Sequence, residues 1–168
     1  MPERHIPDPV LIAQLQNSER PIEWAAALVK RRQHERIDGE WSAHQHVFHL
    51  LATERQVYQP RLEQLLNEDS PNFLFFDSPG FMDTQYSKSP DMEGLAAQFV
   101  DARAKTVEIL KTAGRDDWKR TAKWPDGTEV DLAWFAEKIL WHGLDHLASI
   151  LDIHGELEPK QAPAWFDG

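Results

Sequence analysis

Residues 134–147 read Trp134-Phe135-Ala136-Glu137-Lys138-Ile139-Leu140-Trp141-His142-Gly143-Leu144-Asp145-His146-Leu147, with two histidines four residues apart. On an α-helix, residues at this spacing share one face, and their β-carbons lie about 5–6 Å apart. Steps of three and four residues lead from the histidines to the apolar residues on either side, which are Phe135, Ile139, Ile150 and Ile153. The pattern therefore predicts an amphipathic helix whose apolar face carries both imidazoles.

The histidine pair has two interpretations. A histidine on an apolar face is usually a core residue that makes a hydrogen bond. Two neighbouring imidazoles, however, bring several polar atoms into a low-dielectric setting, and a shared metal ion satisfies these atoms at once. The spacing alone does not decide between the two. A metal site would also need a third ligand from elsewhere in the chain.

Composition limits what the protein can be. The chain has 168 residues, of which 41% are hydrophobic, so we expect a single domain over residues 1–168 with its core at about 8–154. The formal charge of -10 argues against binding to nucleic acid or to anionic membranes. No cysteine is present, so a metal would be held by His, Asp or Glu. No apolar run is long enough for a signal peptide or a membrane span, and we expect a cytoplasmic protein.

The N-terminal third predicts a kinked first helix and the start of a second. Asp8 is placed to cap a helix that has Pro9 in its first turn, and we expect a kink or a restart near Pro21. Ser42 and Gln45 have the spacing of a capping box. The second helix is expected to run from there to about Leu66, with Pro60 as its one interruption.

Three histidines fall on this second helix, at positions 44, 46 and 49. His46 lies nearer the middle of the apolar stripe and His49 lies at its edge. Periodicity alone therefore does not choose a third metal ligand between them.

The segment from Asn67 to Ser89 combines turn-forming residues with several aromatic ones, which are Phe73, Phe75, Phe76, Phe81 and Tyr86. A structureless linker would not carry so many rings, so we expect a packed loop over one end of the protein. Such a loop could form one wall of a pocket. It could equally be an irregular connection that buries its own aromatic side chains.

The third helix is expected to begin with Ser89 as cap and Pro90 in its first turn, and to end near Gly114. Arg103 falls on its apolar face, where an unpaired charge would be very costly. Glu54 lies within the apolar stripe of the second helix and is the natural partner. The alternative is that Arg103 binds the carboxylate of a ligand.

The last helix is expected to run from a cap at Asp131 to about His154, with Gly155 as its stop and the turn signal Pro125-Asp126-Gly127 before it. Residues 155–168 are expected to form a tail that docks on the body or on a second subunit. With no convincing strand, the sequence predicts an all-α four-helix bundle with a long loop between its second and third helices.

Several short motifs now resemble the DinB-like superfamily in order and spacing, from about Leu11 to Ile153. They are Gly39-Glu40-Trp41-Ser42, His49-Leu50, Glu54-Arg55, Arg103, His142 and His146-Leu147. The resemblance implies a four-helix bundle, often a homodimer, with a divalent metal held by His49, His142 and His146. Gly143 departs from the family, because many relatives carry aspartate there, and we expect this change to alter the support of the ligands.

Three imidazoles would leave a coordination position open, which is typical of a catalytic site. Zinc or nickel suits neutral nitrogen donors, and iron is a third option. The resemblance implies a metal-dependent thiol S-transferase that joins a low-molecular-weight thiol to a small electrophilic substrate. The alternatives are a metal-dependent hydrolase and a non-catalytic metal-binding or ligand-binding stress-response module. His46 and Arg103 are the candidate catalytic residues.

Overall fold

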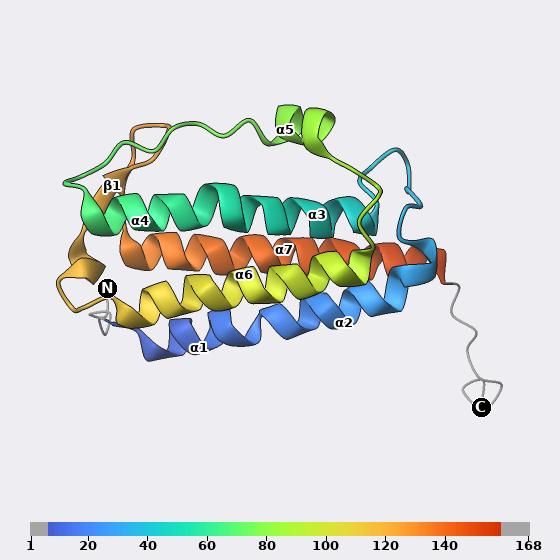
Figure 1. The fold of residues 1–168 in the computed structure, drawn as a ribbon, viewed down its shortest axis with the longest axis horizontal. Coiled ribbons are helices and arrows are strands. Elements are labelled where there is room, and N and C mark those ends of the chain that lie inside the picture. Colours follow the sequence, from blue (N-terminus) through green and yellow to red (C-terminus); the bar gives the residue numbers. More distant parts are fainter. Residues whose placement is uncertain (1–6, 159–168) are drawn as a thin grey trace, which may run out of the picture.

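The computed structural model describes residues 7–158 and is a four-helix bundle, which confirms the fold class predicted from the sequence (Figure 1). The first helix of the bundle consists of α1 (Pro9–Asn17) and α2 (Glu19–Val29), and the second consists of α3 (Ala43–Thr53), a π-helical turn (Glu54–Tyr58) and α4 (Gln59–Asn67). The third is α6 (Met92–Thr112) and the fourth is α7 (Leu132–Leu157). Shorter elements are 3-10 turns at Lys30–Arg32 and Asp117–Lys119, α5 (Ser78–Gln85), β1 (Thr121–Lys123) and β2 (Glu129–Asp131).

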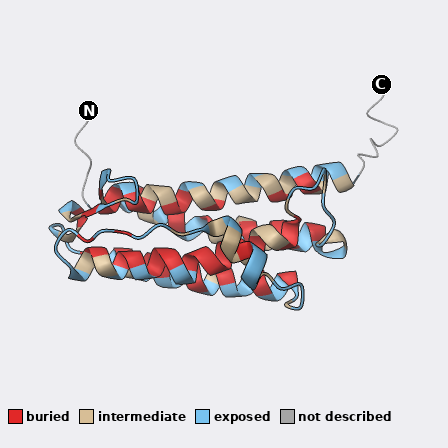
Figure 2. Ribbon diagram, turned by 90° about the horizontal axis from the view of Figure 1, so that it is seen from above, coloured by how far each residue is buried: buried red, intermediate tan, exposed pale blue. Residues whose placement is uncertain are grey.

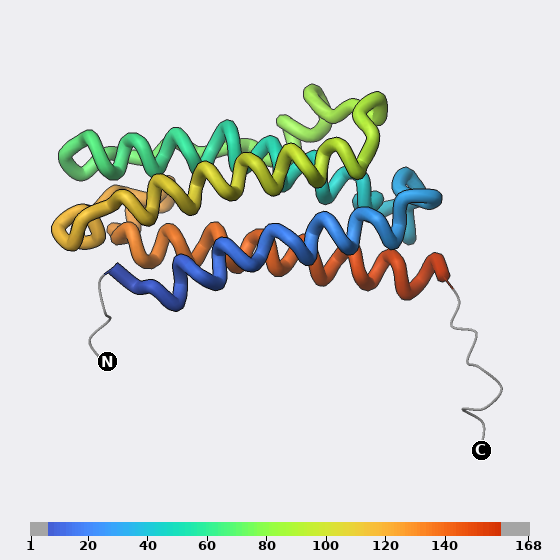
Figure 3. Tube along the Cα trace, turned by 60° about the horizontal axis from the view of Figure 1, so that its bottom comes forward, coloured from blue at the N-terminus to red at the C-terminus, as the bar shows by residue number. Residues whose placement is uncertain are grey.

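The helices do not simply alternate in direction. The α3–α4 segment and α6 run the same way, opposite to α1–α2 and α7 (Figures 1 and 3). The connection between α4 and α6 must therefore return along the length of the bundle, and it carries α5 on the way. The expectation of a loop over one end was wrong, because two parallel neighbours need a connection as long as the helix itself.

Three helix starts agree with the sequence. Asp8 accepts hydrogen bonds from the N–H groups of residues 10 and 11. Ser42 and Gln45 form the reciprocal capping box. Asp131 accepts the N–H of Trp134 at 2.7 Å. These caps satisfy backbone donors that have no partner within the helix.

Two other helix ends were predicted wrongly. The helix α6 begins at Met92 with Asp91 as its cap, rather than at Ser89, because the side-chain oxygen of Gln33 accepts the N–H of Met92 at 3.1 Å. The helix α7 continues through Gly155 to Leu157, whose carbonyl accepts a hydrogen bond from Arg32. In both cases a side chain distant in sequence supports the helix end.

A small hairpin was also missed. The strands β1 and β2 pair in antiparallel register, with Ala122 opposite Val130, around the predicted turn Pro125-Asp126-Gly127. Gly127 has φ +88, a conformation that favours glycine. Three-residue strands are too short to show a period of two, so the pattern did not reveal them.

Buried residues line the inward faces of the helices (Figure 2). They form two apolar clusters, one around Phe135 and Trp118 and the other around Phe99 and Ile150. Among the described residues, no helix is long and apolar enough to cross a membrane. The tail expected over residues 155–168 lies outside the described part of the chain from residue 159 onward.

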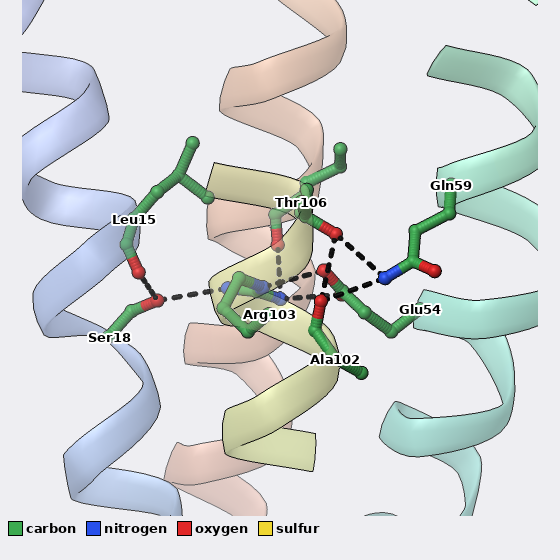
Figure 4. A network of polar contacts seen from close by, with 8 residues as sticks. Leu15, Ser18, Glu54, Gln59, Ala102, Arg103 and Thr106 are labelled. Atoms are coloured by element: carbon green, nitrogen blue, oxygen red, sulfur yellow. Dashed lines mark hydrogen bonds and ion pairs between the residues drawn. The ribbon is translucent and has the colours of Figure 1, made fainter. Parts of the chain in front are cut away.

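A buried ion pair connects the helices (Figure 4). Arg103 is completely buried and donates to both carboxylate oxygens of Glu54, at 2.9 and 3.0 Å. Its other contacts are the hydroxyl of Ser18 at 2.9 Å and the carbonyl of Ile139 at 3.5 Å. The predicted pair is therefore confirmed, and the alternative in which Arg103 binds a ligand is contradicted because no part of this side chain is accessible.

Two helix irregularities occur at the partners of Arg103. The first helix breaks at Ser18, three residues before the expected Pro21, and Pro21 lies within the first turn of α2, where a proline costs little. The π-helical turn begins at Glu54 and ends just before Pro60. Its wider spacing lets the N–H of Gln59 bond to the carbonyl of Glu54, so the helix continues past a proline.

Replacing Arg103 with methionine should lower the free energy of unfolding by about 3–5 kcal/mol, because the carboxylate of Glu54 would be left buried and unpaired. The double variant with Glu54→Gln should lose less than the sum of the two single losses. Urea unfolding of the four proteins measures this coupling. The matched control is Lys111→Met, which removes an exposed ion pair with Glu108 and should cost less than about 1 kcal/mol. Strictly additive losses would contradict the network.

Candidate metal site

Three histidines from two helices meet in the middle of the bundle. His49 comes from α3, and His142 and His146 come from α7. One ring nitrogen from each of them lies within 4.8 Å of the others, and the Nε2 atoms of His49 and His142 are 3.1 Å apart. The three histidines that the resemblance names therefore converge on one point. Periodicity had left His46 and His49 equally open.

Burial keeps these imidazoles neutral. It lowers the pKa of His49 to about 4, that of His142 to about 3 and that of His146 to about 2. The charges of neighbouring groups, including Arg103 beside His142, act in the same direction as burial. A neutral imidazole has a free lone pair, which is the form that binds a metal ion. The donor set therefore fits a divalent ion.

Hydroxyl groups surround the ring of His49. The Oγ1 of Thr53 lies 3.5 Å from Nδ1 and 3.3 Å from Nε2, and the Oγ of Ser78 lies 3.4 Å from Nδ1. The ring of Trp41 lies over His49 and His146, with centroids 5.1 and 6.2 Å away. Hydroxyl partners of this kind orient a ligating histidine, and the indole shields the cluster from solvent. Trp41 was identified from the sequence only within the motif Gly39-Glu40-Trp41-Ser42.

His46 lies next to the cluster and contacts His146. Its Nδ1 is 2.7 Å from the Nδ1 of His146, so one of these nitrogens donates to the other. This contact leaves the Nε2 of His146 available to a metal ion. His46 lines a smaller cavity of about 320 Å³, together with acidic residues such as Asp152 and Glu156. As a candidate acid or base, it therefore lies away from the larger cavity that His49 and His142 line.

Gly143 is buried in α7 with its backbone against Arg103, and a β-carbon there would lie 3.5 Å from the guanidinium. The position at which many relatives carry aspartate therefore faces the buried ion pair. A side chain at this position would contact Arg103, and the expectation that the change alters the support of the metal ligands stays a prediction. The carboxylate that pairs with Arg103 in this chain is that of Glu54.

The larger cavity, of about 610 Å³, opens onto the histidines. Phe75 and Phe76 of the loop before α5, together with Ser78 at the start of α5, form one wall of it, as the first interpretation of that segment had suggested. Its polar residues Tyr58, Arg61 and Lys138 were not predicted as site residues. The lining consists of His49, Thr53, Val57, Tyr58, Arg61, Phe75, Phe76, Ser78, Trp124, Pro125, Asp126, Lys138 and His142.

Comparison with known proteins agrees with this architecture. A family model described as the DinB superfamily matches residues 14–150. The chain is 26% identical over 117 residues to the protein of Bacillus subtilis (strain 168) called "Putative metal-dependent hydrolase YfiT". The match covers 69% of this chain and 65% of that protein, so the chain spans about two thirds of the length of this relative.

Two solved structures from Bacillus subtilis share the fold. YfiT, described as "a probable metal-dependent hydrolase with an unusual four-helix bundle topology", gives a TM-score of 0.79 at 23% identity, over 88% of this chain and 85% of that one. The DinB-like protein YjoA gives a TM-score of 0.60 at 15% identity, over 92% and 96%. At these identities the comparison supports the fold alone.

The metal-free protein should lose stability as the pH falls below about 6.5. The unfolded histidines take up protons near that pH, whereas the folded ones stay neutral until the pH approaches their lowered pKa values. Each histidine can contribute up to about 1.4 kcal/mol per pH unit. Urea unfolding between pH 7.5 and 5 with a chelator present measures the slope. His142→Gln should make the slope shallower, and an unchanged slope would contradict neutral burial of this residue.

Proposed function

The chain belongs to the DinB superfamily, and on that basis we propose that it is a metal-dependent hydrolase of small molecules, with His49, His142 and His146 as the metal ligands. The observation that carries the proposal is the convergence of three neutral imidazoles, two of which, His49 and His142, line a 610 Å³ cavity. A bound divalent ion would supply Lewis-acid activation there. The name of the relative YfiT points the same way.

The residues of the chain would perform the remaining tasks. Ser78 contacts the Nδ1 of His49, and the Nε2 of that ring lies 3.1 Å from the Nε2 of His142, where it would bind the ion. Tyr58 lines the cavity beside His142, with ring centroids 5.4 Å apart, and burial raises the pKa of its hydroxyl above the ordinary value. The hydroxyl therefore stays protonated and can donate a hydrogen bond to a substrate oxygen. The aromatic residues Phe75, Phe76 and Trp124 give the cavity an apolar wall for the substrate.

A thiol S-transferase is the second candidate. The chain has no cysteine, so an attacking sulfur would have to arrive with a separate thiol. The cavity volume lies within the usual range for sites that hold small ligands, and it leaves room for a thiol beside an electrophile. Zinc or nickel as the metal, and a homodimer as the assembly, remain predictions of the resemblance.

Purified protein without an affinity tag should contain about one divalent ion per chain, because the three ligands form one site. His146→Gln should remove the ion and lower the melting temperature of metal-loaded protein, since binding stabilises the folded state. Elemental analysis with a thermal melt measures both. The control is His34→Gln, an exposed histidine outside the cluster, which should keep its ion. Full metal content in the His146 variant would refute the assignment.

Turnover separates the two activities. The hydrolase should cleave small activated esters or amides with no thiol present, and chelation should abolish the reaction while leaving the helical circular dichroism nearly unchanged. The transferase should consume a chromogenic electrophile only when a small thiol is added. Metal-loaded protein that is inert in both assays would favour a binding module over either enzyme.

A further inference from the structure

Arg61 is a buried cation without an anion. It lies on α4, and only 8% of the residue is exposed. Its Nη2 donates a hydrogen bond to the carbonyl of Leu74 at 2.6 Å, and its guanidinium packs on the rings of Trp124 and Phe73 at 4.7 and 5.3 Å. Within residues 7–158, no carboxylate forms an ion pair with it. The free donors of this side chain remain available in a cavity wall.

Arg103 has an anionic partner, which Arg61 lacks within the described residues. Both arginines are buried, but Arg103 is bonded to a carboxylate, a hydroxyl and a carbonyl. Arg61 has one carbonyl, and burial lowers the pKa of its guanidinium, which shows that its charge is poorly compensated. A buried charge of this kind is costly unless an opposite charge joins it. Arg61 lines the cavity beside His49 and His142.

A second cation lies against the same indole. The Nζ of Lys138 is 5.1 Å from the ring centroid of Trp124 and 5.8 Å from that of Trp134, and it has no ion pair within the described chain. Asp126 is the one carboxylate in the cavity lining, and it already accepts the N–H of Thr128 at 2.9 Å. With two cations and one carboxylate in its lining, this cavity carries an excess of positive charge in a chain of net charge -10.

The two cations lie one helical turn from residues at the histidine cluster. Lys138 precedes His142 by four residues on α7, and Arg61 follows Tyr58 by three residues where the π-helical turn joins α4. One turn corresponds to about 5 Å along a helix. A ligand group bound by the cations would lie about that far from the reacting group. Apolar rings at 75, 76 and 124 line the space between and around them.

We propose that the natural substrate is a small molecule with an apolar part and an oxyanion group, which Arg61 and Lys138 bind while the reacting bond lies beside the three histidines. This inference deepens the proposed function and rests on it for the reaction. The oxyanion is a carboxylate or a phosphate, since a guanidinium fork binds either one. Anionic substrates should therefore be preferred over neutral ones of the same shape.

Calorimetric titration of metal-loaded protein with 3-phenylpropanoate, its neutral amide and phenyl phosphate tests the binding step without turnover. We expect one or both anions to bind at least about tenfold more tightly than the amide. Arg61→Gln and Lys138→Gln should remove most of that preference while leaving amide binding unchanged. Lys105→Gln, an exposed lysine of α6 outside the cavity, is the control and should bind as the parent protein does.

A titration after chelation and a second variant distinguish the possible outcomes. Titration after chelation should preserve the anion preference, and its loss would overturn the inference because the metal ion itself would be the receptor. If Arg61→Gln fails to fold, Arg61→Lys keeps the charge without the planar fork and should retain part of the preference. Equal binding of anions and amide by the parent protein would refute the anion site but not hydrolysis. Anion binding without turnover of any ester would refute the hydrolase alone.

Discussion

The buried guanidinium of Arg103 must be satisfied on every side, and the bundle is arranged around that requirement. Its partners come from the first helix at Ser18, the second at Glu54 and the fourth at Ile139, while the arginine itself belongs to the third. The first two partners lie at the break between α1 and α2 and at the start of the π-helical turn. In regular helices these groups would not lie beside the guanidinium, so the helix irregularities and the ion pair depend on each other.

Local rules predicted the features that depend on a few consecutive residues. The capping box at Ser42, the cap at Asp131 and the shared face of His142 and His146 follow from spacing alone, and so does the burial of Glu54 and Arg103. The failures involve contacts between distant residues. Gln33 determines where α6 begins, and Arg32 supports the end of α7, but no window of sequence contains both partners of either contact.

The candidate site likewise has features that the sequence predicted and features that it did not. Periodicity indicated inward histidines on two helices but could not say which histidine of α3 meets the pair on α7, because the rotation of one helix against another is decided by packing. Arg61 and Lys138 were missed for a related reason. On a helix taken alone, each resembles a solvated charge, and only the folded chain brings both to the indole of Trp124. A tertiary contact with an aromatic ring produces no periodic pattern in the sequence.

The order of the helices along the chain affects when the histidine cluster can exist. His49 and His142 are separated by 93 residues, and α7 is the last element of the described chain. While the chain is still on the ribosome, Ser18, Glu54 and Arg103 emerge before the two histidines of α7, so the central charge can be paired in a nascent chain that holds one imidazole of three. The complete histidine cluster can therefore form only after α7 has been synthesised.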